Sequence, residues 1–488
     1  MPQWLRTRRS VVSHPHSLTV AGAAQVAGRG PVPVSRLTLE KERTEAIDYR
    51  PTSTSCIGLR AIAPLRIQSI GHRSAAPCTA AIDFTGSAMS ERIVIVGAGH
   101  SAGMAATSLR EHGYAGEIVV VGEEAHRPYQ RPPLSKNFLA GQMAVEQLQL
   151  KPEKFYLERS VTFRLNCRVE RIDRKARSLE LSDGSSLTYT MLLLATGSRP
   201  RRLSMPGADL AGVHYLRTIS DVEGIKADMA PGKRLVVVGG GYIGLEAAAI
   251  AVKAGLSVTV LEAASRILAR VSGPQTSTFF TEEHRRQGVE IRCNAAVHAL
   301  DGITRVEAVK TNDGNIPADL VIAGVGIEPV CELAVAAGLA CDNGIVVDEH
   351  ARTADEFIYA AGDCTNHPNA LLGCRLRLES VQNAVDQSRV AAANMCGKPT
   401  LYSELPWFWS NQFDLRLQIA GLSQGHDAAV LRGDCVARNF SVMYLKGGRL
   451  IAADTVGAPK DHLAFRKLIV AGGAFDAQKF ADPATPLA

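Results

Sequence analysis

The sequence IVIVGAGHSAG at residues 93–103 determines the first part of the fold. Four consecutive apolar residues predict a strand that is buried on both faces of a parallel sheet. Gly97, Gly99 and Ala102 then form a G-x-G-x-x-A turn before a helix. In such a turn the first glycine permits a tight bend, the second lets a pyrophosphate approach the backbone, and the third small residue allows close packing. The segment therefore predicts a dinucleotide site at a helix N-terminus.

A second apolar run at residues 118–121 predicts the next strand, and Glu123 follows it, 24 residues after Gly99. An acidic side chain there can accept hydrogen bonds from both hydroxyls of an adenosine ribose. A glutamate at a strand end can also be a solvated charge. The pattern becomes informative because it occurs twice.

The second copy begins 142 residues after Gly97, at Gly239. It consists of a strand at 235–238, the turn GGGYIG with Gly239, Gly241 and Gly244, a helix through 247–252, a strand at 258–261, and Glu262. Both copies continue with a polar hairpin around an Asp-Gly turn, and then with an apolar strand that runs into glycine. The hairpin turns are at 183–184 and 313–314, and the closing strands are at 192–197 and 321–326. Two chance matches with the same downstream order are improbable, so we expect two bound dinucleotides, one per copy.

The composition is that of an ordinary globular protein, with 46% hydrophobic and 21% charged residues among 488. Residues 1–88 carry 11 Lys and Arg against 5 Asp and Glu, which accounts for the whole net charge of +6. The remainder is neutral, which argues against nucleic-acid binding. The longest apolar stretch contains Glu246 and Lys253, so we expect no membrane span.

Residues 1–88 show no sustained period of 2 or 3.6 and are rich in Pro, Ser, Arg and Gly. We expect the working protein to begin near Met89, with the upstream part disordered or a start-site artefact. Arg6, Arg8 and Arg9 before a weakly apolar run leave a targeting segment as the alternative.

The ten cysteines include no C-x-x-C pair and no zinc-like spacing. We expect them to be small buried hydrophobic residues in a reducing cytoplasm, and we expect no metal site.

Five short segments indicate a family. ATGSRP at 195–200 and AAGD at 360–363, together with the two nucleotide folds, resemble the two-dinucleotide-binding-domain flavoproteins. YQRPPLSK at 129–136, RLESVQNA at 377–384 and PWFWSNQ at 406–412 resemble the FAD-dependent ferredoxin reductases of bacterial oxygenase systems, the group of putidaredoxin reductase and biphenyl dioxygenase ferredoxin reductase. The resemblance extends over essentially all of residues 89–488.

This resemblance implies an α/β fold with two Rossmann-like dinucleotide-binding domains, similar to glutathione reductase, and a C-terminal α+β domain. The expected division is an FAD domain at 89–199 and 325–404, an NAD domain at 200–324, and a C-terminal domain at 405–488. In the C-terminal domain we expect a hairpin at 446–449 and a helix over about 460–470.

By the same resemblance the first copy holds FAD and the second holds NADH. The expected cofactor-binding residues are Gly97, Gly99, Ala102, Glu123, Arg131, Lys136, Ala195, Thr196, Gly197, Arg199, Gly239, Gly241, Gly244, Glu262, Gly326, Gly362, Asp363, Glu379, Val381 and Trp409. The expected catalytic residues are Lys136, Glu246 and Trp409.

The resemblance also assigns roles. Arg131 and Lys136 lie against the flavin, where a cation stabilises the negative charge of the reduced ring. Trp409 lies beside the isoalloxazine and the nicotinamide, and Glu379 and Gln382 line the same cavity. Asp363 accepts from the ribityl chain close to a helix that begins after the AAGD turn.

Two residues of the second copy carry specific expectations. Glu246, which follows the GGGYIG turn, is expected to form an ion pair with Lys136. Glu262 is expected to select NADH over NADPH, because a 2′-phosphate would face its carboxylate. Arg266, four residues later, can partly receive such a phosphate.

The expected reaction is a direct hydride transfer from nicotinamide to flavin N5, followed by single-electron transfer to a separate 2Fe-2S ferredoxin. The chain is expected to be a monomer or homodimer. One alternative is an NADH oxidase or peroxidase with a single reactive cysteine in the 40 residues after Glu123, but no cysteine occurs between Cys78 and Cys167. A second alternative is a partner-binding flavoprotein that is similar to apoptosis-inducing factor.

Overall fold

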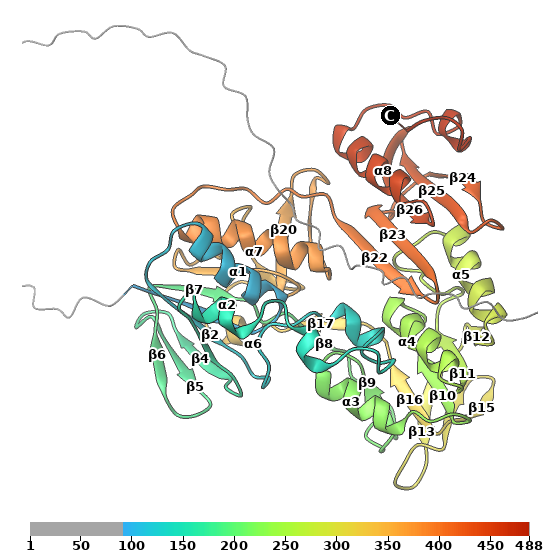
Figure 1. Cartoon of the computed structure of the whole chain (residues 1–488), viewed down its shortest axis with the longest axis horizontal. Coiled ribbons are helices and arrows are strands. Elements are labelled where there is room, and N and C mark those ends of the chain that lie inside the picture. The colour runs from blue at the N-terminus through green and yellow to red at the C-terminus, as the bar shows by residue number, and fades with distance from the viewer. Residues whose placement is uncertain (1–90, 488) are drawn as a thin grey trace, which may run out of the picture. The chain divides into compact units, whose positions relative to one another are not determined.

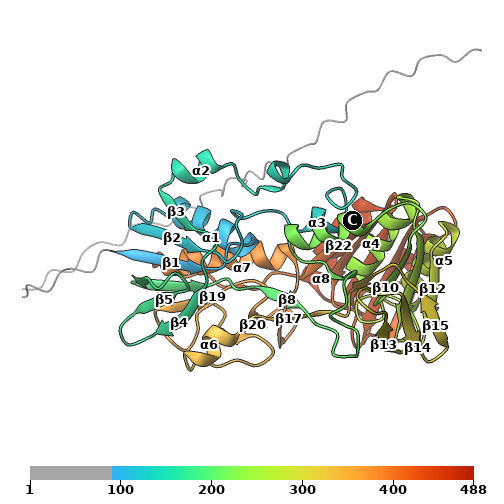
Figure 2. The same ribbon diagram turned by 90° about the horizontal axis from the view of Figure 1, so that it is seen from below.

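The computed structural model describes residues 91–487. The expectations for residues 1–88 and for a start near Met89 lie outside the described residues. Within them, Figures 1 and 2 show two α/β lobes and a C-terminal sheet that carries its own helix.

The first lobe is built on a five-stranded parallel sheet. Its strands, in spatial order, are β19 (Ile358–Ala360), β7 (Met191–Leu194), β1 (Arg92–Val96), β2 (Glu117–Val121) and β3 (Val161–Arg164). Because β1 is central, its side chains are buried on both faces, as the continuous apolar run predicts. Helices α1 (His100–Glu111) and α7 (Val381–Met395) pack on one face through small side chains such as Ala105 and Ala391. The other face is covered by α6 (Glu332–Ala336) and an antiparallel sheet of β4 (Val169–Asp173), β5 (Ser178–Leu181) and β6 (Ser186–Thr188).

The second lobe repeats this plan, except at one edge of its sheet. Its parallel sheet consists of β9 (Val213–Tyr215), β16 (Leu320–Ala323), β10 (Arg234–Val238), β11 (Ser257–Glu262) and β12 (Glu290–Cys293). The edge strand β9 precedes the other four strands in the chain, whereas β19 follows them in the first lobe. Helices α4 (Tyr242–Lys253) and α5 (Pro274–Arg286) cover one face. The other face packs on the antiparallel strands β13 (Val297–Asp301), β14 (Ala308–Thr311) and β15 (Gly314–Pro317). Both predicted Asp-Gly hairpins are therefore confirmed, as β5–β6 and β14–β15.

The C-terminal part is a five-stranded antiparallel sheet with a helix on one face. Its strands are β22 (Trp407–Gln412), β23 (Leu415–Gly421), β26 (Arg449–Val456), β25 (Asn439–Lys446) and β24 (Ala428–Asp434). The predicted hairpin joins β25 to β26, and the predicted helix is α8 (Pro459–Ala471). One face of the sheet packs on α8, and the other shares a hydrophobic core with α4 and α5.

Short elements connect these layers. They are η1 (Pro132–Ser135), η2 (Val145–Leu148), α2 (Glu153–Leu157), β8 (Ser198–Pro200), α3 (Ile219–Asp228), β17 (Ile327–Pro329), β18 (Ile345–Val346), β20 (Thr365–Asn369), β21 (Cys374–Leu376) and η3 (Lys479–Ala481). Strands β8 and β17 pair with each other where the chain passes between the two lobes.

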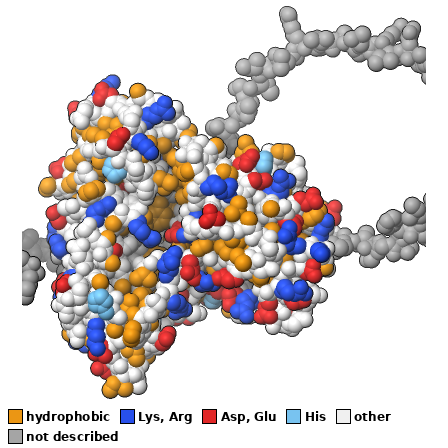
Figure 3. All heavy atoms as spheres, turned by 180° about the vertical axis from the view of Figure 1, so that it is seen from behind, with side chains coloured by type: hydrophobic (Ala, Val, Ile, Leu, Met, Phe, Trp, Pro, Cys, Tyr) orange, Lys and Arg blue, Asp and Glu red, His pale blue; other side chains and the backbone are white. Residues whose placement is uncertain are grey.

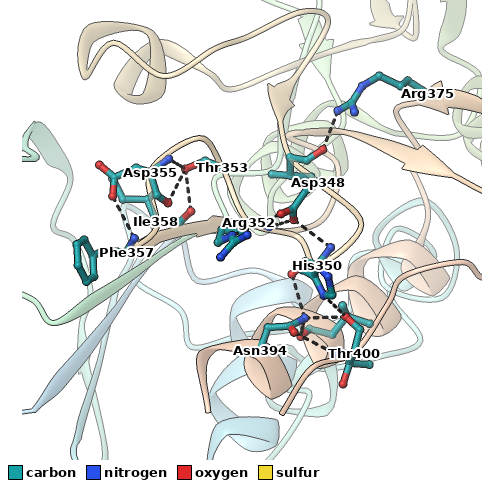
Figure 4. Close-up of polar contacts among 12 residues, drawn as sticks. Asp348, His350, Arg352, Thr353, Asp355, Phe357, Ile358, Arg375, Asn394 and Thr400 are labelled. Carbon is teal, nitrogen blue, oxygen red and sulfur yellow. Dashed lines mark hydrogen bonds and ion pairs between the residues drawn. The ribbon is translucent and has the colours of Figure 1, made fainter. Parts of the chain in front are cut away.

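The loop before β19 is tied to α7 by polar contacts (Figure 4). The Asp348 carboxylate accepts the main-chain N–H groups of His350, at 3.0 Å, and Arg352, at 2.8 Å. The Nδ1 atom of His350 lies 2.9 Å from the carbonyl oxygen of Thr400, and the Asn394 amide donates to the same oxygen at 2.8 Å. These contacts hold β19 in register beside the helix that closes the first lobe.

No helix within residues 91–487 is both long enough and apolar enough to cross a membrane. In the same range no group of three or more His, Cys, Asp or Glu side chains is arranged to hold a metal ion. Of the eight cysteines described, Cys167 and Cys364 are buried, whereas Cys374 is exposed. The expectation of buried thiols is therefore correct for only part of the set.

Candidate active site

The first glycine turn has the backbone form that its sequence predicts. Gly97 has a φ of +106°, and a Cβ there would lie 2.2 Å from the carbonyl oxygen of Ala195. A Cβ on Gly99 would meet no atom within 4 Å, so the space beside this residue is open. Ala102 is fully buried against the sheet. The open space at a helix N-terminus fits the pyrophosphate of a dinucleotide.

Charged side chains from distant segments gather beside this turn. Ser198 donates to the Asp363 carboxylate at 2.8 Å, and the Arg217 guanidinium lies 3.4 Å from the same oxygen. Burial, and then the positive charge of Arg131, lower the pKa of Arg217, whereas Asp363 raises it. An anion beside the Arg217 guanidinium would offset this destabilisation of its charge. The donor set therefore fits the phosphates of FAD.

Arg131 is held in place by the loop that precedes it. Its guanidinium donates to the Glu124 carboxylate and to the carbonyl oxygen of Arg217, both at 2.6 Å, and to the Tyr129 hydroxyl at 2.9 Å. Glu124 therefore neutralises Arg131, while the adjacent Glu123 remains exposed at the end of β2. Glu123 is free to accept from a ribose, as its position predicts.

His100 is the first residue of α1 and faces the same group of charges. Burial, followed by the charge of Arg131, lowers the pKa of His100 to about 4. Without a bound anion the imidazole is therefore neutral at physiological pH, and it can either accept or donate a hydrogen bond.

The second glycine turn matches the first. A Cβ on Gly239, which has a φ of +110°, would lie 2.4 Å from the carbonyl oxygen of Gly324. A Cβ on Gly241 would again meet nothing within 4 Å. A Cβ on Gly244 would lie 2.4 Å from the Gly239 carbonyl oxygen, so only glycine allows α4 to pack this closely on the turn.

Glu262 is not a solvated charge at a strand end. One carboxylate oxygen accepts the Gly240 N–H and the other accepts the Ala264 N–H, both at 2.8 Å. An ionised carboxylate has lone pairs for further donors, so the ribose hydroxyls can still bind. The Arg266 guanidinium donates to the carbonyl oxygens of Ser272 and Ala269. It is therefore already engaged, which weakens the expectation that it receives a 2′-phosphate.

Glu246 joins the two lobes and the C-terminal sheet. One of its oxygens accepts from Lys136 Nζ at 2.6 Å and from the Ser135 hydroxyl, which belongs to the loop of the first lobe. The other accepts from the Ser410 hydroxyl at 2.6 Å and the Asn411 N–H at 3.3 Å. The predicted ion pair is confirmed, and the carboxylate is almost fully buried. Glu246 lies in the second turn of α4, so these four donors stabilise it more than the helix dipole does.

Three aromatic side chains, Trp407, Phe408 and Trp409, come from β22, the strand that contacts this carboxylate. Trp409 stacks on Trp407 with ring centroids 5.5 Å apart, and Arg466 of α8 lies 5.0 Å from the Trp407 ring centroid. Successive strand residues point to opposite faces, so Phe408 faces the second lobe, where it stacks on Tyr242 at 4.6 Å. Trp409 lies between Phe408 and Ser410 in β22, so its ring points to the opposite face of the sheet, where it stacks on Trp407.

The other predicted cofactor residues lie near the two turns or are engaged elsewhere. Thr196 donates to the carbonyl oxygen of Val330, and a Cβ on Gly197, which has a φ of +67°, would lie 3.5 Å from the Arg217 guanidinium. A Cβ on Gly362 would lie 2.3 Å from the Ser101 hydroxyl of α1, and one on Gly326 would lie 3.6 Å from the Arg270 guanidinium.

Two of the predicted residues form ion pairs with protein groups. Arg199 pairs with Glu328 and Glu332 on the exposed β8–β17 ribbon. Glu379 is exposed and pairs with Arg377. Arg217, in contrast, lies at the site, although its segment YLRT at 215–218 contains no recognisable motif.

The expected helix after the AAGD turn is wrong. Asp363 is followed by β20, and α7 begins only at Val381, with the Ser380 hydroxyl as its cap. The Gly362 N–H is bound by the side chain of Gln387, from within α7, at 2.8 Å. The helix therefore reaches the turn from the side, and Asp363 is oriented by Ser198 rather than as a helix cap.

Comparison with known proteins identifies both parts of the chain. Residues 91–388 match the family described as pyridine nucleotide-disulphide oxidoreductase, and residues 407–488 match a reductase C-terminal domain.

Relatives cover most of the chain. A ferredoxin–NAD(P)(+) reductase of Sphingomonas sp. is 44% identical over 399 residues, which are 81% of this chain and 96% of that protein. A rubredoxin–NAD(+) reductase of Pseudomonas putida is 39% identical over 75% of this chain and 96% of its own length. The crystal structure of a covalent putidaredoxin reductase–putidaredoxin complex superimposes with a TM-score of 0.79 at 42% identity, covering 81% of this chain and 97% of that chain.

Proposed function

The chain belongs to the pyridine nucleotide-disulphide oxidoreductase family of FAD-dependent oxidoreductases, and we propose that it is an NADH-dependent ferredoxin reductase whose acceptor is a 2Fe-2S ferredoxin of an oxygenase system. The contact of Lys136 with Glu246 carries this proposal, because it brings the loop of the first nucleotide fold to the helix of the second. When bound, FAD accepts a hydride from NADH and passes its electrons on singly.

The residues around this contact position the reactants and exclude water. Glu246, with its four donors, fixes Lys136, and on the same face of β22 Phe408 stacks on Tyr242, whereas Trp409 lies on the opposite face with Trp407. Direct hydride transfer requires orientation more than proton transfer.

The thiols of the described chain argue against a peroxidase or disulfide reductase. Cys364 directly follows Asp363, which lies beside the first glycine turn. It is fully buried, its Sγ contacts the carbonyl oxygens of Leu194 and Ala361, and burial raises its pKa. A buried neutral thiol is a poor nucleophile, so electrons have to leave by another route.

We propose that this route leads to a ferredoxin at the face that carries Trp407 and α8. Arg466 over Trp407 and the exposed Lys467 offer positive charge there, and Lys446 and Arg449 offer more at the β25–β26 turn. Arg375 and Arg377 are weaker candidates, since Arg375 donates to main-chain oxygens and Arg377 pairs with Glu379. Figure 3 shows basic and acidic side chains interspersed over the face opposite to Figure 1, without a patch of one sign.

Because NADH and reduced thiols occur in the cytoplasm, we place the enzyme there.

Ferredoxin reduction is expected to weaken with salt. Raising the ionic strength from about 0.01 M to 0.15 M shortens the Debye length from about 30 Å to 8 Å and suppresses steering. Lys467→Glu should raise the KM for an acidic ferredoxin severalfold and flatten this salt dependence, whereas Lys154→Glu, on the exposed α2, should change neither. A salt-independent rate in the wild type would contradict the charged docking face.

The proposed function is tested by steady-state reduction of cytochrome c with NADH. Reduction should require an added 2Fe-2S ferredoxin, and rubredoxin should substitute poorly. Equal rates with ferredoxin and rubredoxin would leave the reductase activity in place but remove the proposed acceptor specificity. Fast NADH oxidation by oxygen or peroxide alone would support the oxidase alternative instead.

A further inference from the structure

A buried carboxylate of the C-terminal sheet reaches into the second nucleotide fold. Asp454 of β26 is completely buried, and one of its oxygens accepts from the Tyr444 hydroxyl at 2.6 Å and from the Thr276 hydroxyl at 2.8 Å. The Tyr444 oxygen in turn accepts the Gly273 N–H at 2.8 Å. A Cβ on Gly273 would lie 2.5 Å from the Tyr444 ring, so this contact requires glycine. Asp454 thus holds the start of α5 from another domain.

This carboxylate has no cationic partner among the described residues. Burial raises the pKa of Asp454 to about 6, and the hydrogen bonds from Tyr444 and Thr276 only partly oppose the shift. Folding therefore favours the protonated acid, and the stability that protonation supplies is lost as pH rises through 6. An uncharged side chain of the same size would avoid this cost. A carboxylate at position 454 therefore lowers the free energy of unfolding more than an uncharged side chain of the same size would.

The same cluster continues to the second glycine turn. The Ser272 hydroxyl is buried beside both Asp454 and Tyr242, without hydrogen-bond geometry to either. Tyr242 is the first residue of α4, directly after Gly241. Its ring is half-buried and stacks on Phe408, while its hydroxyl is buried and has no partner in the described structure. The hydroxyl end of Tyr242 therefore lies on the side of Asp454, and its ring lies between the second glycine turn and Phe408.

We propose that Asp454 is a positioning residue for NADH: its contacts with Thr276 and Tyr444, and the contact of Tyr444 with Gly273, fix the segment at Ser272 beside which the Tyr242 hydroxyl is buried at the second glycine turn. This inference rests on the proposed binding of NADH by that fold. A shift of the Tyr242 ring would change both the room for the nicotinamide half and its alignment, because the ring is the first side chain after the turn. The C-terminal sheet thereby contributes to nucleotide binding without contacting the nucleotide.

Asp454→Asn in the FAD-loaded protein tests the proposal, with NAD⁺ affinity measured by calorimetry and flavin reduction by rapid mixing. We expect the Kd for NAD⁺ to rise about tenfold, while reoxidation of the reduced enzyme by ferredoxin is unchanged. The matched control is Thr455→Val, the next residue of β26, which is buried on the other face and has a hydroxyl without a partner in the described chain. It should bind NAD⁺ as the wild type does.

A double-mutant cycle between Asp454 and Tyr242 distinguishes positioning of Tyr242 from a general loss of stability. In a Tyr242→Phe background, Asp454→Asn should have little further effect on the Kd, because that background lacks the hydroxyl end that is buried beside the segment held by Asp454. Tyr444→Phe should weaken binding in the same direction and serves as the test if Asp454→Asn does not fold. Additive effects, or a Kd in Asp454→Asn and Tyr444→Phe equal to that of the wild type, would overturn the proposal.

A pH profile gives a second readout. Tyr444 and Tyr242 face Asp454, and Glu246 faces Tyr242, while His426 packs on the Tyr444 ring at 5.1 Å. The wild-type Kd should rise severalfold as pH falls from 7 to 5 and Asp454 takes up a proton, and the Asp454→Asn variant should show a flat profile. A profile that persists in the variant would assign it to another group, such as His426. Absence of NAD⁺ binding by the wild type would instead overturn the proposed function.

Discussion

Glu246→Ala is expected to slow reduction of the flavin by NADH about a hundredfold. The substitution leaves Lys136, Ser135 and Ser410 without their common acceptor in a buried place. Breaking a buried ion pair costs about 3 kcal/mol or more in stability, and a misplacement of about 1 Å at the reacting groups can cost about a hundredfold in rate. Rapid mixing of the oxidised protein with NADH measures this directly.

Two further variants separate charge from burial. Glu246→Gln keeps an acceptor for the serines but removes the charge opposite Lys136, so its rate should fall between those of the wild type and Glu246→Ala. Glu283→Ala is the matched control, because Glu283 of α5 is also a buried, ion-paired glutamate, held by Arg438. It should lower the free energy of unfolding without slowing hydride transfer. A Glu246→Ala protein that is reduced at the wild-type rate would show that the ion pair has no part in the reaction.

Preference for NADH over NADPH is expected to depend on Glu262. The carboxylate is held by Gly240 and Ala264 at the end of β11, so it cannot turn away from a 2′-phosphate. A buried charge left unpaired costs several kcal/mol, so the ratio of kcat/KM values should favour NADH by about a hundredfold or more. In Glu262→Gln the ratio should fall at least about tenfold, since the repulsion is removed.

The informative quantity is the ratio of kcat/KM with NADH to kcat/KM with NADPH. Loss of the Gly240 or Ala264 contact would weaken both cofactors and leave their ratio unchanged. Glu290→Gln provides the control, because Glu290 lies on the neighbouring strand β12 and is largely exposed. It should change kcat/KM for neither NADH nor NADPH. Equal use of NADH and NADPH by the wild type, or an unaltered ratio in Glu262→Gln, would contradict the assignment.

The parts of the fold that depend on local pattern were predictable from the sequence. Both glycine turns, the two Asp-Gly hairpins and the β25–β26 hairpin follow from short-range sterics, since a tight turn admits few residues. The Lys136–Glu246 pair was also predictable, but only because two family motifs had to meet at one flavin.

The failures concern residues whose roles depend on distant partners. Nothing local to Asp363 shows that a strand follows it and that Ser198 orients it. Arg217 reaches the first turn, whereas Arg199, which lies in a recognised motif, is neutralised by Glu328 and Glu332. A single sequence does not reveal which of several arginines will be buried, because burial is decided by packing between segments far apart in the chain.

Reduction of a 2Fe-2S ferredoxin in a single anaerobic turnover tests the proposed function most directly. The FAD-loaded protein is mixed with one equivalent of NADH and an excess of oxidised ferredoxin, and the reduced iron-sulfur centre is counted by electron paramagnetic resonance. Because a hydride carries two electrons and the cluster accepts one, two reduced ferredoxins should form per NADH. Flavin that is reduced by NADH but then leaves the ferredoxin oxidised would contradict the assignment.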